Sequence, residues 1–381
     1  MGLIPLIRSA MYGGTDSPFS PGGSSHSPIR MHVYGPPGIR KFVRFNLQIT
    51  EVGLFGKFAV HELLQMDEAP STGCKNEDMH ENEVAGQDLI AGEDGLWRNI
   101  LEAGEWSVDA GPVTHRTRSL GYVFRERGSS SIGGAAYIAA IDANDAQLRA
   151  NGHRNPRSLL SVLLKKRQPV SLPDGTVLEP PPLDIPGRKI VILGDTSNSD
   201  KMIPIAMDAS ALVHECTNAY IPRNVANNVR GMNGRGTEEI VKAKAISRGH
   251  STANMAGEFA KKIRARRLYM NHFSTRFSPG GQSPHPGIGR GKPSSAQKEA
   301  ALVMAEIERQ ASEAWGLGNA VAAKDLQIVD IQHHEVVLPT PPSTSFPIEQ
   351  KVSTSTQAII LDGGGEEAWE RRIEEEVKAE L

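Results

Sequence analysis

Cysteine is scarce in this chain of 381 residues, which contains only Cys74 and Cys216. Two cysteines cannot form a disulfide framework or a cysteine-rich zinc module, so a reducing compartment is the default expectation. Aromatic residues are also few, at 5% of the chain, but the hydrophobic share of 39% is enough to build a globular core. A chain of this length forms one large domain or two ordinary ones.

Long apolar runs and an excess of one charge are missing as well. No stretch approaches the roughly 20 uninterrupted apolar residues that a membrane-spanning helix needs, and the apolar start of the chain is broken at Arg8. The 42 basic and 44 acidic residues leave a net charge of -2, which excludes a polycation of the histone kind. Any contact with nucleic acid therefore depends on a local basic patch.

Segments with the pattern of strands alternate with segments that have the pattern of helices. Short apolar or alternating runs predict strands over 29–35, 56–63, 106–128, 209–218, 266–273 and 326–338. The apolar run from Ile190 to Leu193 predicts a strand that is buried on both faces. Helical spacing predicts helices after Gly38, over 251–264 behind a Ser251 or Thr252 cap, and over 295–314. This alternation predicts a layered α/β sandwich.

By composition, the chain divides into one folded domain and a tail. We predict that residues 1–340 form the domain, interrupted by a polar and acidic surface insertion over 66–106. A linker rich in Pro, Ser and Thr, followed by an acidic helical tail, is expected over 341–381. The acidic insertion and tail offset basic segments elsewhere, which accounts for the near-neutral balance.

Acidic and imidazole side chains recur where the predicted strands end. Asp195, Glu215 and His272 each stand at the end of a strand, His115 lies in an alternating segment, and His250 precedes a helix. Ligands on rigid strand ends are what a metal-dependent hydrolase requires, and zinc accepts both imidazole nitrogen and carboxylate oxygen. Taken singly, each of these residue types is more often only hydrogen-bonded, so spacing alone does not identify a site.

Longer segments, taken in order, resemble a known family. They are VYGPPGIRKFV (33–43), VTHRTRSLGYVF (113–124), GRKIVILGDTSNSD (187–200), ALVHECT (211–217) and GHSTANMAGEFAKKIRARRLYMNHFSTRF (249–277). Together they resemble ribonuclease Z, also called tRNase Z, the tRNA 3′-processing endoribonuclease of the metallo-β-lactamase superfamily. The family's matching motifs include GDT, HEAT, HST and T-H-x-S-x-R-[YF]. The resemblance implies an αββα fold and zinc-dependent cleavage of precursor tRNA on the 3′ side of the discriminator.

The same resemblance implies a role for each candidate residue. His115, Asp195 and His272 correspond to zinc ligands, with Asp195 bridging two ions. Glu215 and His250 correspond to the pair that helps to protonate the leaving 3′ oxygen, and a carboxylate-oriented imidazole is a suitable general acid. Contacts to the substrate are implied for Ser274, Arg276 and, in a tRNA-gripping arm near 150–175, Lys165, Lys166 and Arg167.

The family's HxHxDH motif does not occur in the 381 residues. By the resemblance it stands immediately before GLIPLIRSAM (2–11), where it supplies four of seven zinc ligands and an Asp that is the general base. We therefore expect an αββα fold without its N-terminal strands, zinc binding that is weak or partial where a complete site holds two ions, and impaired cleavage. A truncated gene model and a genuine remnant are both left open.

Two other functions stay open at this stage. The alternative is a catalytically silent remnant that acts as a binding or dimerisation partner, because the family often forms homodimers. A metallo-β-lactamase-fold hydrolase of a small ester is disfavoured by the HST and HEAT-like segments. The expected partners are precursor tRNA and a second copy of the chain, with no membrane, in the nucleus or cytoplasm and with the mitochondrion as an alternative.

Other residues that resemble functional ones are predicted to be structural. His214 is expected to support its strand end, Cys216 to lie buried in the core, and KKIRARR (261–267) to form a solvated helix face. GIGRGK (287–292) imitates a phosphate loop, but it follows a Pro/Gly loop where a phosphate loop follows a buried strand, which favours a linker. The pair His333-His334 matches no ligand of the family.

Overall fold

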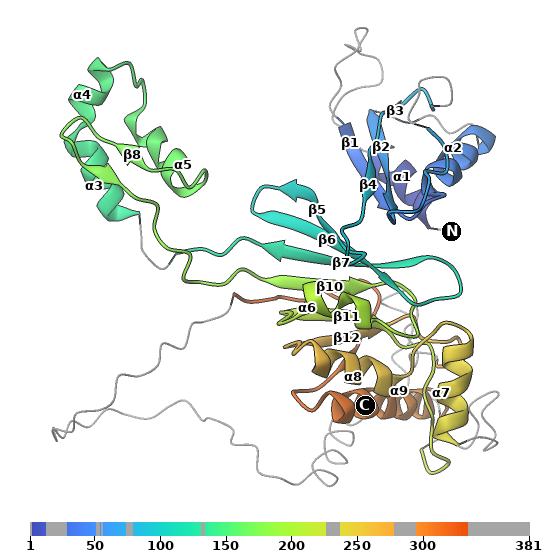
Figure 1. Cartoon of the computed structure of the whole chain (residues 1–381). Helices are drawn as coiled ribbons and strands as arrows, with labels where there is room; N and C mark the ends of the chain where they lie inside the picture. Colours follow the sequence, from blue (N-terminus) through green and yellow to red (C-terminus); the bar gives the residue numbers. More distant parts are fainter. Residues whose placement is uncertain are drawn as a thin grey trace, which may run out of the picture. The chain divides into compact units, whose positions relative to one another are not determined.

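The structure is a computed structural model that describes residues 2–12, 29–50, 54, 56–73, 79–130, 134–225, 237–277 and 295–333 (Figure 1). The described residues divide into two compact units, a larger one within 1–125 and 189–329 and a smaller one within 126–188 and 330–333. No helix in these ranges is long and apolar enough to cross a membrane. The predicted linker and tail over 341–381 and the GIGRGK segment lie outside the described residues.

Two helices and a small parallel sheet form the first two layers of the larger unit. The strand β2 (Lys57–Leu64) pairs with β1 (Ile29–Gly35) and with the short strands β3 (Glu83–Val84) and β4 (Asp88–Ile90). The helices α1 (Leu3–Tyr12) and α2 (Ile39–Thr50) share a buried cluster with this sheet. Alternation along β2 produces the layering, since Phe58 and Val60 face the helices whereas Leu63 faces the second sheet.

A seven-stranded sheet forms the third layer, in the order β13-β12-β11-β10-β7-β6-β5. Strands β10, β11 and β12 run parallel, whereas β7 runs antiparallel to β10. The strands of this sheet are β5 (Trp97–Ala103), β6 (Trp106–Val113), β7 (Ser119–Glu126), β10 (Lys189–Leu193), β11 (Ala211–Glu215), β12 (Leu268–Asn271) and β13 (Val321–Ala322).

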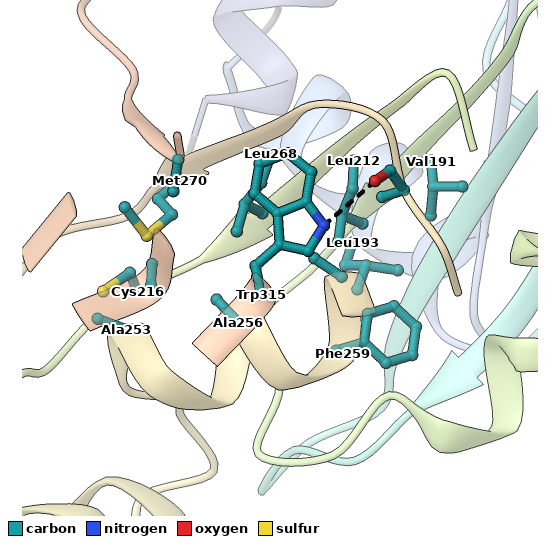
Figure 2. Close-up of a cluster of buried hydrophobic side chains, with 14 of the residues drawn as sticks. Val191, Leu193, Leu212, Cys216, Ala253, Ala256, Phe259, Leu268, Met270 and Trp315 are labelled. Atoms are coloured by element: carbon teal, nitrogen blue, oxygen red, sulfur yellow. Dashed lines mark hydrogen bonds between the residues drawn. The ribbon is translucent and has the colours of Figure 1, made fainter. Parts of the chain in front are cut away.

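The helices α8 (Ala253–Lys262) and α9 (Ser295–Trp315) form the fourth layer. Figure 2 shows the indole of Trp315 among apolar side chains of β10, β11 and β12, where its N–H donates to the carbonyl of Ala265 at 3.1 Å. Gly257 allows the close approach of α8 to α9, because a Cβ at this position would lie 2.3 Å from the carbonyl oxygen of Ala311. The same unit contains the helices α6 (Ile203–Ala206) and α7 (Glu238–Ser247).

A separate cluster of side chains fills the space between the two sheets. It includes the buried residues Leu63, Trp97, Val108, Ala110 and Leu120. With helices packed against the outer face of each sheet, the order of layers is helix, sheet, sheet, helix. The predicted αββα sandwich is therefore confirmed.

Three expectations from the sequence are corrected by the structure. The segment 66–106 is not a surface insertion, since it supplies β3, β4 and β5 and buries Trp97 in the core between the sheets. The strand over 326–338 does not form in its described part, 326–333, where Leu326 is fully exposed. Strand β10 is buried on one face only, because Ile192 is 40% exposed on the other.

The smaller unit has a core of its own. It contains α3 (Ala135–Ala143), α4 (Asp145–Ala150), α5 (Leu159–Leu164) and the hairpin of β8 (Val170–Ser171) with β9 (Val177–Leu178). Ile141, Leu148 and Leu163 are buried together with residues of the hairpin. The predicted arm, 150–175, lies entirely within this unit.

Two buried arginines on α2 hold the acidic segment that follows β2. Arg40 is fully buried and donates to the carbonyl of Thr72 and to the carboxylate of Asp88, both at 2.7 Å. Arg44 donates to both carboxylate oxygens of Glu83, at 2.7 and 2.8 Å. Fork-like pairs of this kind are geometrically specific, which explains how a polar stretch becomes an ordered part of the sheet.

We predict that Arg40→Met lowers the free energy of unfolding by about 3–5 kcal/mol, because it leaves the carbonyls of Val60 and Thr72 without their donor and removes the positive charge 3.8 Å from the buried carboxylate of Glu62. Chemical denaturation measures the loss. The control is Arg98→Met, which breaks an exposed pair with Asp94 and is expected to change stability by less than about 0.5 kcal/mol. Equal losses in the two variants would contradict a structural role for the buried pair.

Candidate metal centre

Four of the predicted site residues lie at one edge of the seven-stranded sheet. His115 follows the end of β6, Asp195 follows β10, Glu215 ends β11 and His272 follows β12. The parallel strands β10, β11 and β12 end at the same edge, so their terminal residues converge. His250 enters the cluster from the loop between α7 and α8, next to a bridge that joins Asn218 to Thr252.

The side chains of these five residues approach one another in two overlapping groups. The Nε2 atom of His272 lies 3.5 Å from Oδ1 of Asp195, and the ring of His250 lies between those of His115 and His272, with centroid distances of 4.9 and 5.4 Å. Two sets have possible ligand atoms within 4.8 Å of one another: His115, Asp195 and His250, and Glu215, His250 and His272.

The carboxylate of Glu215 is buried and already fully hydrogen-bonded. Its Oε1 accepts from the backbone N–H of Thr196 and of Ser251 and from Nδ1 of His250, at 3.0, 3.1 and 3.0 Å. Its Oε2 accepts from the backbone N–H of Thr217 at 2.9 Å. A carboxylate with this many donors has little capacity left for a metal, so Glu215 is better suited to orienting His250 than to binding a metal, and His115, Asp195, His250 and His272 stay as candidate ligands.

In His115 and His250, the hydrogen bond made by Nδ1 determines which ring nitrogen is free to bind a metal. Nδ1 of His115 lies 2.7 Å from the carbonyl of Gly249, and a carbonyl only accepts, so this Nδ1 carries the proton. Nδ1 of His250 donates to Glu215 for the same reason. In the neutral rings Nε2 therefore keeps its lone pair, and this is the arrangement found in metal-binding histidines.

Position 249 requires glycine because the backbone there passes close to His115. Its φ of +80° lies in the left-handed region, and a Cβ would stand 2.5 Å from Nδ1 of His115. Any side chain at this position would therefore displace the imidazole. Because Asp195 and His272 are half-exposed, the cluster is open to solvent on their side.

Ser274 and Arg276 belong to the loop that carries His272. The guanidinium of Arg276 donates to Oγ of Ser274 at 3.2 Å and to Oδ1 of Asn218 at 3.0 Å. Burial, together with the positive charge of Arg248, lowers the pKa of Arg276 from its ordinary value. Its described hydrogen bonds go to neutral oxygens, so its charge is available to an anion such as phosphate.

The three basic residues predicted to contact tRNA lie in the smaller unit. Lys165 and Lys166 are exposed and follow α5 directly. Arg167 differs from them, because its guanidinium donates to the carbonyl of Pro181 and its φ is +57°. A role of the three residues in substrate binding stays a prediction. Arg167 also has a structural contact through its side chain.

The residues that we predicted to be structural have the expected surroundings, apart from part of the segment 261–267. His214 is buried, its Nδ1 lies 2.7 Å from the carbonyl of Glu215, and burial lowers the pKa of its imidazole. Cys216 is fully buried, and burial raises the pKa of its thiol. The prediction for 261–267 is correct only in part. Lys262 and Arg264 pair with Asp200 and Asp208 on the surface, but α8 ends at Lys262 and Ile263 and Ala265 are buried, so most of the segment is not a helix face. His333 lies 3.6 Å from Glu126 in the smaller unit, and His334 is not among the described residues.

Comparison with known proteins finds relatives of one kind. No protein-family model matches the chain. Ribonuclease BN of Cronobacter sakazakii is 29% identical over 280 residues, which are 73% of this chain and 67% of that protein. Zinc phosphodiesterase ELAC protein 1 of Homo sapiens is 26% identical over 318 residues, 81% of this chain and 76% of the relative. Ribonuclease Z of Natronomonas pharaonis is 27% identical over 306 residues, 79% and 77% of the two chains.

Four layers in the order helix, sheet, sheet, helix, with the candidate residues at the strand ends, form the arrangement that the predicted metallo-β-lactamase fold has. In sequence the chain is similar to proteins named ribonuclease Z and zinc phosphodiesterase, so the predicted resemblance is confirmed. Among solved structures, human tRNase Z, short form, matches 72% of this chain and 68% of its own at 22% identity and a TM-score of 0.40. The assignment rests on the sequence relatives and not on that superposition.

Sequence patterns did not reveal the residues that orient the cluster. Thr217, the carbonyl of Gly249 and the backbone N–H groups of Thr196 and Ser251 all contact predicted site residues. Each lies in or beside a segment that carries the family resemblance, so proximity to a motif is the only signal that the sequence offers for them. Their contacts join positions up to 134 residues apart.

We predict that Glu215→Gln lowers the free energy of unfolding by about 3 kcal/mol, because the amide NH₂ faces backbone donors and leaves buried groups without an acceptor. Thermal and chemical unfolding measure this change. The matched control is Glu258→Gln on α8, whose carboxylate is exposed, with an expected change below about 0.5 kcal/mol. If the Glu215 variant were as stable as this control, its carboxylate would not hold the surrounding loops together.

Proposed function

We propose that this chain is a zinc-dependent endoribonuclease of the ribonuclease Z type, which removes 3′ trailers from precursor tRNA. The observation that carries the proposal is the proximity of candidate ligands from four separate loops. Ligand atoms of His115, Asp195 and His250 lie within 4.8 Å of one another, and Nε2 of His272 lies 3.5 Å from Oδ1 of Asp195. Relatives named ribonuclease Z and zinc phosphodiesterase support the substrate class and the metal.

The donor set suits zinc. Imidazole nitrogen and carboxylate oxygen bind zinc at about 2.0–2.2 Å, which places two ligand atoms of a tetrahedral ion about 3.3 Å apart. The separation of 3.5 Å between Nε2 of His272 and Oδ1 of Asp195 is close to that value. We assign His115, Asp195 and His272 as ligands. A zinc site supplies an activated water and stabilises the charge that develops on phosphate oxygens.

The pair of Glu215 and His250 is suited to proton transfer. Because Nδ1 of His250 is held by Glu215 at 3.0 Å, its Nε2 is the nitrogen that can carry a second proton toward the substrate. The buried carboxylate stabilises the imidazolium that results, so the ring can protonate the leaving 3′ oxygen. Arg276 donates to no carboxylate in the described part of the chain. Its guanidinium is therefore suited to bind the phosphate beside the scissile bond.

For the 381 residues as printed, we propose that cleavage is impaired. Three ligands from separate strand ends are enough to hold one ion, whereas a two-metal site with a positioned hydroxide requires more donors than these three residues provide. The second candidate function is a catalytically silent partner of this fold. The proximity of the candidate ligand atoms favours the enzyme over that candidate, since a silent partner has no need of it.

We predict that the purified chain binds no more than one zinc ion, and that Asp195→Ala abolishes this binding because it removes the carboxylate closest to His272. Isothermal titration with zinc and metal analysis after dialysis measure the stoichiometry. Asp208→Ala, which removes an exposed carboxylate paired with Arg264, is the control and is expected to bind zinc as the parent chain does.

Two outcomes of that titration would contradict the proposal in different ways. Unchanged zinc binding in Asp195→Ala would mean that the ligand assignment is wrong. Loading of two zinc ions together with cleavage of precursor tRNA would refute impairment while leaving the assignment intact.

We further propose that the chain forms a homodimer through an apolar face of α2. While Arg40 and Arg44 are buried, Phe42, Phe45 and Ile49 are 43%, 60% and 63% exposed, at helical spacing on one side of the helix. These three side chains expose about 300 Å² of apolar surface in each copy. If they packed against each other in a dimer, the area buried on both copies would be about half of the 1,200 Å² that the smallest stable interfaces bury. A second copy of the chain is the occupant that the resemblance also implies.

We predict that Phe45→Glu converts a dimer into a monomer, because a buried unpaired carboxylate opposes association. Light scattering coupled to size-exclusion chromatography at micromolar concentration measures the mass. The control is Ile246→Glu, which changes an exposed isoleucine on α7 and is expected to leave the mass unchanged. A parent chain that is monomeric, or a Phe45→Glu variant that remains dimeric, would contradict this interface.

A further inference from the structure

A single hydroxyl lies against two imidazoles of the cluster. Oγ1 of Thr217 is 2.8 Å from Nδ1 of His272 and 3.3 Å from Nδ1 of His250, and it is 3.2 Å from the carbonyl oxygen of His272. Thr217 stands two residues beyond the end of β11, so the rigid strand determines where its side chain lies.

The hydrogens of this group can be assigned by counting donors and acceptors. A threonine hydroxyl has one hydrogen and two lone pairs, and a carbonyl oxygen can only accept. We assign the hydroxyl hydrogen to the carbonyl of His272, so that Oγ1 accepts from an imidazole N–H. His250 gives its Nδ1 proton to Glu215, which is nearer at 3.0 Å and charged, so the partner of Oγ1 is Nδ1–H of His272.

This assignment leaves Nε2 of neutral His272 with a lone pair, 3.5 Å from Asp195. The reverse arrangement, with the proton on Nε2, would turn the same ring into a hydrogen-bond donor to Asp195 and remove it as a ligand. The hydroxyl of Thr217 thus favours the tautomer of His272 that can bind a metal over the tautomer that cannot.

Thr217 also holds the unusual backbone of His272. The φ of His272 is +57°, in the left-handed region that is uncommon for residues other than glycine. Oγ1 of Thr217 holds the carbonyl of this residue, and two residues further on the N–H of Ser274 donates to the carbonyl of Thr217 at 3.2 Å. Both the tautomer and the direction of the ring therefore depend on one residue.

We propose that Thr217 is a positioning residue, which fixes His272 as the Nδ1–H tautomer and directs its Nε2 at the metal position. This inference rests on the proposed zinc site for its functional meaning, but the tautomer itself is a property of the metal-free chain. Removing a residue that hydrogen-bonds to a metal ligand commonly lowers the affinity for the metal by about 10–100-fold.

The test compares Thr217→Val, which has the same shape without the hydroxyl, with Thr217→Ser, which keeps it. Nitrogen-15 NMR of the histidine-labelled, metal-free full chain at one pH identifies the tautomer of His272, with His272→Gln used to assign its signals. Zinc titration then gives the dissociation constant of each chain. We expect Nδ1–H in the parent and in Thr217→Ser, loss of that preference in Thr217→Val, and zinc affinity that falls about 10–100-fold in Thr217→Val alone.

The results separate this inference from the proposed function. An Nε2–H tautomer in the parent chain, or a Thr217→Val variant that keeps the parent's tautomer and zinc affinity, would overturn the role of Thr217. A parent chain that binds no zinc but loses its tautomer preference in Thr217→Val would refute the zinc site and confirm the positioning role. Equal far-ultraviolet circular dichroism of the three chains shows that folding is not the cause.

Discussion

The buried carboxylate of Glu215 is the constraint on which the rest of the site depends. Its two oxygens accept four hydrogen bonds, from Thr196, Thr217, Ser251 and His250. The three backbone donors belong to the loops after β10 and β11 and to the loop before α8. One carboxylate therefore joins three chain segments and orients an imidazole, so the positions of the candidate ligands are coupled to the stability of the sheet edge.

A second buried network gives the N-terminal part of the larger unit its order. Because Arg40 and Arg44 point inward to Asp88 and Glu83, helix α2 buries these two charges beside the apolar side chains of the core and exposes Phe45 on its other side. The arrangement converts an acidic, weakly periodic stretch into strands of the sheet. It also leaves an apolar surface, for which a second copy of the chain is the proposed cover.

Much of the fold and the identity of the candidate ligands could be predicted from the sequence, because apolar runs end at Asp195, Glu215 and His272 and the order of motifs matches one family. The strands within 66–106 could not, since their charges are neutralised by arginines from a different element. Thr217 could not either, because a tautomer depends on contacts such as the one 55 residues away at His272. The composition of a segment describes only its own residues, whereas these strands and this tautomer depend on residues elsewhere in the chain.

The central claim is that a metal ion binds at the strand edge between Asp195 and His272. The most direct measurement is the anomalous scattering of zinc in crystals of the chain soaked in that metal. We predict a peak within bonding distance, about 2.0–2.2 Å, of Oδ1 of Asp195 and of Nε2 of His115 and His272. Zinc bound only elsewhere on the chain, with these three side chains unligated, would contradict the claim.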